Sequence, residues 1–185
     1  MKLKTVVITA ALVFAANVSA LAQAHQTQPT TTAPTQSSRD ATREKLRTLL
    51  AQSGPKINVA FQQSDKQPYN FVGLMSTGLT TADSFEIVIS IGDQETIHFR
   101  IFPKYKGVYV NVDKASDRAG LLRQMVRLSD QNFLYWGADE SFDVFAGYNF
   151  TLESGFPTAS INVVLNSIKN LDQFVGQMKP AIDGN

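Results

Sequence analysis

The sequence predicts one α+β domain, an antiparallel sheet with helices packed on one of its faces. Two strand-like runs on either side of Gly92-Asp93 predict a β-hairpin, and residues 159–178 carry apolar side chains at helical spacing. The length of 185 residues allows one domain and makes two cramped. A hydrophobic content of 43% supplies a packed core. We expect the order α-β-β-β-(β)-α-β-β-α.

The N-terminus has the pattern of a secretory signal peptide. Lys2 and Lys4 precede an apolar run over 6–16, and two small-x-small cleavage sites follow within 20–24. The run is shorter than the roughly 20 residues that a membrane-spanning helix needs. We therefore expect removal of residues 1–24, export to the periplasm or the medium, and no membrane span after cleavage.

Residues 25–38 are rich in Gln, Thr and Pro and contain almost nothing large enough to bury. Such a segment does not recover the entropy lost on ordering, so it predicts a flexible tether. The folded domain is then expected over residues 39–182.

Composition excludes several classes of protein. Loss of Lys2 and Lys4 with the leader takes the 17 basic residues to 15, against 16 acidic residues. This balance lacks the basic excess of a nucleic-acid binder. The chain has no cysteine, which excludes disulfides, thiol catalysis and Cys-ligated zinc.

The first half of the folded part reads as a helix followed by strands. Residues 39–52 are amphipathic and are followed by a Ser-Gly-Pro stop. Alternation over 57–61 and over 69–75 predicts two strands. The clearest hairpin joins 84–91 to 95–102.

Beyond that hairpin, Pro103 is expected to close the second arm and residues 104–107 to form a turn into a further strand, 108–112. A second helix follows over 115–128, in which Gly120 is a weak point. Its candidate N-caps are Asp113 and Ser116.

The last third predicts a second hairpin and a closing helix. The aromatic-rich runs 132–136 and 142–152 flank an acidic turn. The closing helix spans 159–178 and is expected to end at Pro180.

Candidate catalytic groups are few, and each has a structural interpretation that we favour. His98 alternates with apolar neighbours, and no G-x-S-x-G elbow accompanies it. Asp139, Glu140 and Asp143 cluster at the second hairpin turn, where acids solvate turns and bond to local amides. No Gly-rich phosphate loop or calcium loop is present in the sequence. We therefore assign no catalytic residue, no cofactor and no metal ligand, and expect that the protein is not an enzyme.

Partner binding has better candidates. Lys104 and Lys106 would form a basic patch if they shared a face with the second helix, and the alternative is neutralisation within the domain. Alternation places Phe133 and Tyr135 on one face of the second hairpin, and Leu134 and Trp136 on the other. Both faces are partly apolar, so one can pack under the helices and the other is expected to meet a second subunit, a ligand or the tether. The candidate contact residues are Tyr135, Trp136, Lys104 and Lys106.

The order of elements, together with LLRQMVRLSDQNFLYWGADESFDVFAGYNFTLE and NSIKNLDQFVGQMKPAI, resembles the YbjN family of bacterial sensory transduction regulators. The resemblance covers about residues 39–182 and is strongest from Leu121 onward. It implies a fold like that of type III secretion chaperones, a regulatory or chaperone-like role, and self-association as a homodimer. It supplies no active site. The predicted signal peptide departs from the many members that are cytosolic.

Two classes of function follow. The first is an exported, noncatalytic protein that binds another protein, or itself, through a face or edge of its sheet. The alternative is a periplasmic protein that binds a small ligand or lipid between sheet and helices, with a small hydrolase using the acidic turn as a further alternative. An apolar cavity of several hundred cubic ångströms would favour the ligand, whereas a closed core with an apolar outer patch would favour the partner.

Overall fold

In the computed structural model, residues 36–94 and 96–184 are described, with side chains from Ser38 onward. The predicted signal peptide and residues 25–35 of the predicted tether lie outside these residues. The helical elements are α1 (Gln36–Ser53), η1 (Gly54–Ile57), α2 (Arg118–Gln131), α3 (Thr158–Ser167), η2 (Ile168–Asn170) and α4 (Leu171–Asp183). The strands are β1 (Gln62–Gln63), β2 (Asn70–Met75), β3 (Ser84–Ile91), β4 (Thr96–Tyr105), β5 (Val108–Tyr109), β6 (Tyr135–Ala138) and β7 (Val144–Thr151).

The strands form one antiparallel sheet in the order β1-β2-β3-β4-β7-β6, and β5 pairs with the end of β4. The prediction of the α+β class is therefore confirmed. The predicted hairpin is formed by β3 and β4, and its register places Ile91 opposite Ile97 and Ile87 opposite Ile101. Side chains opposite one another across an antiparallel pair lie on the same face, so this register gathers the isoleucines on one side.

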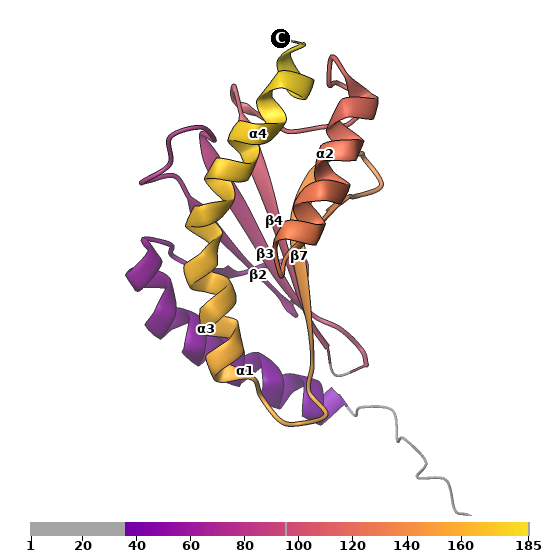
Figure 1. The fold of residues 1–185 in the computed structure, drawn as a ribbon. Coiled ribbons are helices and arrows are strands. Elements are labelled where there is room, and N and C mark those ends of the chain that lie inside the picture. Colours follow the sequence, from indigo (N-terminus) through magenta and orange to yellow (C-terminus); the bar gives the residue numbers. More distant parts are fainter. Residues whose placement is uncertain (1–35, 95, 185) are drawn as a thin grey trace, which may run out of the picture. The chain divides into compact units, whose positions relative to one another are not determined.

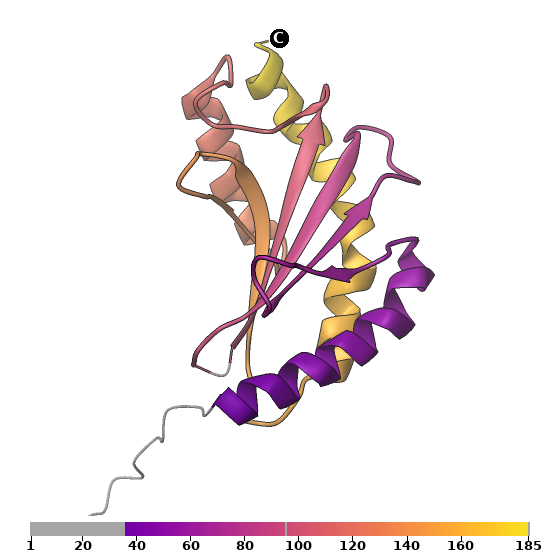
Figure 2. The same cartoon turned by 180° about the vertical axis from the view of Figure 1, so that it is seen from behind.

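The core lies between that side of the sheet and the helices. Phe85 and Ile89 of β3 and Phe99 of β4 are fully buried, and Leu121, Leu165 and Val175 meet them from α2, α3 and α4. Figures 1 and 2 show these three helices together on one face of the sheet. Helix α1 crosses the end of the sheet, where Arg39 donates hydrogen bonds to the Ile91 carbonyl.

The helix starts differ from those predicted. Helix α1 begins at Gln36, so residues 36–38 belong to it and not to a tether. Helix α2 begins at Arg118 and is capped by Asp117, whose carboxylate accepts a 2.8 Å hydrogen bond from the Gly120 amide. A Cβ at Gly120 would overlap that carboxylate. This glycine, predicted to weaken the helix, is the residue that makes room for its cap.

The strand boundaries differ at two places. The alternation of Ile57, Val59 and Phe61 does not form a strand, because Ile57 ends η1 and Asn58 takes a left-handed conformation with φ 56°. Only Gln62–Gln63 pair with β2. Pro103 does not close β4, because the strand continues to Tyr105. The Pro103 carbonyl accepts a hydrogen bond from the Val110 amide.

The closing helix is not continuous. A tight turn, η2, separates α3 from α4, and residues three apart in such a turn are eclipsed, so Ile168 and Leu171 both reach the core. Pro180 lies inside α4, which ends at Gly184 with φ 79°. The predicted stop at Pro180 is therefore wrong. Its missing amide is tolerated near the helix end, where the Gly184 amide bonds back to its carbonyl.

A buried carboxylate ties α4 to the β2–β3 loop. Asp172 accepts hydrogen bonds from the amides of Thr80 (2.7 Å), Thr81 (3.0 Å) and Ala82 (2.7 Å), and from the Thr80 hydroxyl (2.6 Å). Burial raises the pKa of Asp172, but these hydrogen bonds outweigh it and hold the pKa below its ordinary value. The loop is thus fixed to the helix by a charged side chain without a basic partner among the described residues.

Candidate functional site on the open sheet face

The sheet face opposite α2, α3 and α4 carries no helix in the described part of the chain, and we call it the open face (Figure 2). The strand register determines its composition. One row across the strands contains Leu74, Glu86 and Phe102, and the next contains Val88 and Arg100. A third row, with Ser90, His98 and Asn149, is polar. The open face is therefore polar at one end and apolar at the other.

Four rings form a cluster at the apolar end, and we call it the aromatic patch: Phe102, Tyr109, Tyr135 and Phe145. Phe145 lies at its centre, with ring centroids 5.6 Å from Phe102 and 6.1 Å from Tyr135. Phe102 is in turn 6.0 Å from Tyr109. Phe145 is only 6% exposed, yet it does not belong to the main core cluster. The open face thus has a small apolar centre of its own.

Two glycines make room for these rings beside the backbone of the sheet. Tyr135 pairs with Gly147 across the strands, and a Cβ built at Gly147 would lie 2.6 Å from Tyr135 Cζ. Phe145 pairs with Gly137, where a Cβ would lie 3.0 Å from Phe145 Cζ. Each ring covers the backbone that its partner glycine leaves bare, an arrangement that stabilises glycine in strands.

Charged groups border the aromatic patch. Lys104 Nζ lies 3.3 Å from the Glu86 carboxylate, which also accepts a 2.6 Å hydrogen bond from the Tyr109 hydroxyl. Partial burial lowers the pKa of Lys104, but the hydrogen bond to Glu86 and the neighbouring Tyr109 outweigh it, so this pKa is raised. Burial and the Glu86 hydrogen bond also raise the pKa of Tyr109. The Arg100 guanidinium lies 5.0 Å from the Phe145 ring centroid.

A groove runs beside these residues on the open face. It has a volume of about 490 Å³ and lies between the segment 60–65 and strands β2 to β4. Val72 and Leu74 supply apolar lining, and Glu86 and Lys104 supply charge. Leu74 is 51% exposed. Groove and aromatic patch share Glu86 and Lys104 as a common border, so together they form one extended surface.

The chain matches no protein-family model, no curated protein and no solved structure.

The edges of the sheet are less suited to binding than its face. β1 contributes only two residues to one edge, and very short edge strands resist pairing with another chain. At the other edge, the outward Trp136 amide of β6 donates a 2.7 Å hydrogen bond to the Ser129 hydroxyl of α2. The sequence predicted partner binding through either a face or an edge of the sheet, and this geometry favours the face.

The four predicted contact residues are separated by the fold. Tyr135 is 39% exposed on the aromatic patch, and Lys104 lies beside it. Trp136 is 7% exposed on the helix-covered face and is unable to contact a partner directly. Its indole Nε1 has no hydrogen-bond partner in the described structure. Lys106 lies at the β4–β5 turn, where it pairs with Asp183 at 2.7 Å.

Four of the basic groups considered for a patch with α2 each lie beside an acid. Arg118 and Arg123 lie 3.5 and 3.9 Å from Asp113 and Asp117, and Lys104 and Lys106 each have their own acid. The geometry agrees with neutralisation within the domain. In the lysine pair, only Lys104 belongs to the open face.

The groups considered for catalysis have structural partners. The ring nitrogens of His98 lie 2.9 Å from the Thr96 hydroxyl and 2.9 Å from the Asn149 side-chain oxygen. Asp139 accepts hydrogen bonds from the Ser141 and Asp143 amides. Across residues 36–94 and 96–184, no three His, Cys, Asp or Glu side chains are placed to hold a metal ion. Within the same residues, no helix has the length and apolar character needed to cross a bilayer.

Sequence reasoning missed Phe102, Phe145 and Glu86 as parts of the site. The signal for Phe102 was available, because alternation places it on the same face as His98 and Arg100. The sequence contains no such signal for Phe145, because the neighbours of this ring are determined by the pairing of β7 with β4.

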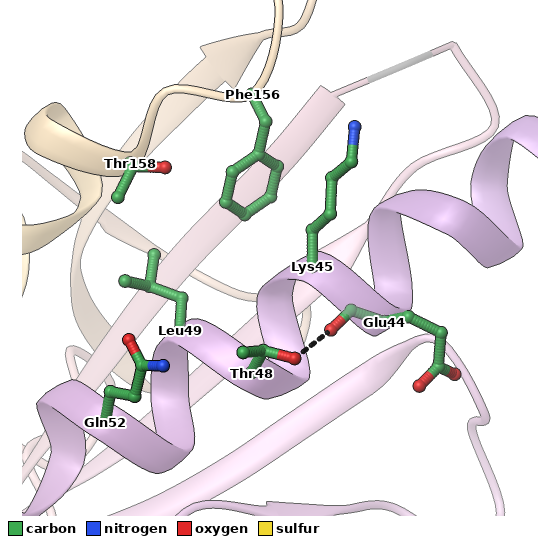
Figure 3. A pocket seen from close by; sticks show the side chains of 7 residues that line it. All are labelled: Glu44, Lys45, Thr48, Leu49, Gln52, Phe156 and Thr158. Atoms are coloured by element: carbon green, nitrogen blue, oxygen red, sulfur yellow. Dashed lines mark hydrogen bonds between the residues drawn. The ribbon is translucent and has the colours of Figure 1, made fainter.

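A second groove, of about 560 Å³, lies between α1 and the loop before α3 (Figure 3). Leu49 and Phe156 form its apolar part, Lys45 extends beside Phe156, and the Glu44 side chain points away from both. Its lining contains a single aromatic ring, Phe156, and no cluster comparable to the aromatic patch.

Proposed function

We propose that this protein is a noncatalytic binding protein that contacts a protein partner through its open face. One observation carries the proposal: Phe145 is buried on the helix-free side of the sheet, outside the main core, in contact with the exposed ring of Tyr135. Aromatic residues ringed by charged groups are typical of the centres of protein interfaces. Arg100 and the Lys104–Glu86 pair supply such a rim.

The packed interior between sheet and helices, together with grooves at the surface, supports a protein partner over a small ligand bound between sheet and helices. Side chains between sheet and helices, such as Phe85, Ile87 and Phe99, are fully buried in one packed cluster. The grooves of about 490 and 560 Å³ lie at the surface. Small-molecule sites are usually concave and enclose most of their ligand.

A noncatalytic role is supported by the partners of the titratable groups. His98 lies within hydrogen-bond distance of a hydroxyl and an amide, and among the described residues no carboxylate is bonded to it in the way that orients a general base. Asp139 stabilises its own turn through backbone amides. The regulatory role and the homodimer implied by the resemblance to the YbjN family remain part of this proposal, as does export directed by residues 1–24.

Site-specific photo-crosslinking in the native host tests the proposal. A benzoylphenylalanine in place of Leu74 or Tyr135 is expected to give the same discrete adduct. The control carries it in place of Val163, which is 58% exposed on α3 and thus matches Leu74 in accessibility. An adduct of twice the chain mass would identify a second copy as the partner. Equal yields from all three positions, or no adduct from the open face, would contradict the proposal.

A further inference from the structure

We propose a separate binding site for a small organic anion in a pocket of about 290 Å³ between η1, the β2–β3 loop and η2. We call it the lysine pocket, because Lys56 of η1 and Lys169 of η2 both line it. The ligand that fits carries a carboxylate or phosphate on a short apolar body. This site goes beyond the proposed protein-binding function and is independent of the open face.

The charge of the lysine pocket points to an anion. No acidic side chain lines it, and neither Lys56 nor Lys169 takes part in an ion pair within the described residues. By contrast, Lys104 and Lys106 each have a carboxylate nearby. Two ammonium groups lining one pocket raise the local potential, and an anion bound there would lower it.

Lys169 is positioned by the backbone beneath it. Gly78 has φ 73°, and a Cβ built there would lie 3.1 Å from both Cε and Nζ of Lys169. The lysine stem therefore lies across a residue that lacks a side chain. Polar groups of Asn58, Thr77 and Asn166 complete the rim and can donate hydrogen bonds to anionic oxygens.

The base of the lysine pocket is apolar. Met75 and Leu165 are 2% and 1% exposed, and Ile57 lies beside them in the lining. A bare inorganic anion would leave the accessible part of Ile57 uncovered, whereas a short aliphatic tail would pack against it. The site should therefore prefer hexanoate to acetate at equal charge.

The test is an NMR titration of the full chain with hexanoate, acetate and inorganic phosphate as probes. Hexanoate is expected to shift the amide signals of Asn58, Gly78 and Asn166 and to bind more tightly than acetate. The K56Q/K169Q variant should bind hexanoate about tenfold more weakly. K66Q removes an exposed lysine outside the pocket and should change nothing.

Each remaining result has a defined meaning. Phosphate binding tighter than hexanoate, lost in K56Q/K169Q, would support the anion site and identify phosphate as its preferred group. Shifts spread over all lysines, or equal affinity in K56Q/K169Q and K66Q, would overturn the site. Because the crosslinking experiment probes Leu74 and Tyr135, failure here is distinguishable from failure of the protein-binding proposal.

Discussion

The ring of Tyr135 rests against the backbone of Gly147, its cross-strand partner, with Cζ 2.6 Å from where a Cβ would lie. The aromatic patch therefore depends on the absence of one methyl group. Any side chain at position 147 must push the ring off the sheet and toward solvent.

We predict that Gly147→Ala destabilises the domain by at most about 1 kcal/mol, because the Cβ displaces an exposed ring that can move toward solvent. Urea unfolding measures the loss. In the background of Tyr135→Ala the same change should cost much less, because the obstructing ring is gone. Gly176→Ala is the control, since a Cβ there makes only ordinary contact with Thr81 and favours the helix. Equal costs with and without Tyr135 would show that the ring is not what position 147 accommodates.

Tyr135→Ala should separate binding from folding. The side chain is exposed at the surface of the aromatic patch, so its removal is expected to change stability by less than about 1 kcal/mol. A central aromatic anchor of an interface contributes about 2 kcal/mol or more to binding. We therefore expect loss of most of the crosslinked adduct from Leu74 with an almost unchanged urea midpoint. Phe145→Ala, by contrast, should cost about 3–5 kcal/mol of stability.

Asp172→Asn is predicted to destabilise the domain by about 2–3 kcal/mol, because hydrogen bonds to a charged acceptor become weaker or lack a proper acceptor. The pKa of Asp172 is lower in the folded state than in the unfolded state. The contribution of Asp172 to the free energy of unfolding is therefore fully present above the pKa of the unfolded state, and it is lost as the pH falls through the pKa of the folded state. Chemical unfolding between pH 6 and pH 2 should show this loss in the native protein and not in Asp172→Asn. If the free energy of unfolding fell in parallel with pH in the native protein and in Asp172→Asn, Asp172 would not be the source of the loss.

The cap of α2 distinguishes two aspartates that look equivalent in the sequence. Asp117→Ala should cost about 1 kcal/mol, because the Gly120 amide loses its acceptor. Asp113→Ala removes only an exposed ion pair with Arg118 and should cost close to nothing. Thermal unfolding of the two variants side by side measures the difference, and a reversed order would place the cap at Asp113.

Export predicts a processed N-terminus. Protein purified from the envelope or medium of its host is expected to begin at Gln23 or His25, after one of the two small-x-small sites. N-terminal sequencing decides between them. An intact Met1 in the mature protein would contradict cleavage.

Local patterns in the sequence were sufficient where one strand or helix determines its own face. Alternation in 84–91 and 96–102 correctly separates Ile87 and Phe99 from Arg100, and it correctly places Trp136 and Tyr135 on opposite faces. It did not indicate which of those two faces is buried, so the prediction of Trp136 as a contact residue was wrong. Such patterns failed where the backbone changes its period. The left-handed Asn58 ends a strand-like alternation. The turn η2 interrupts the closing α-helix although its apolar stripe continues, and no proline or glycine in η2 indicates the break.

The site was only half predictable for a different reason. Tyr135 stands out as an aromatic residue in an alternating run, but Phe102 and Phe145 become neighbours only because β7 lies beside β4. Alternation indicates which face a side chain occupies and does not indicate strand order. The glycines at 137 and 147 have meaning only once the register is known.

The place of β4 has a consequence for how the chain folds. One neighbour, β3, precedes it directly, whereas the other, β7, ends at Thr151. During synthesis, one side of β4 therefore stays unpaired until most of the domain has emerged. Non-local pairing of this kind slows folding and leaves a strand edge open to association. The export that we propose would benefit from such a delay, because the first half of the chain lacks the strands that complete the sheet.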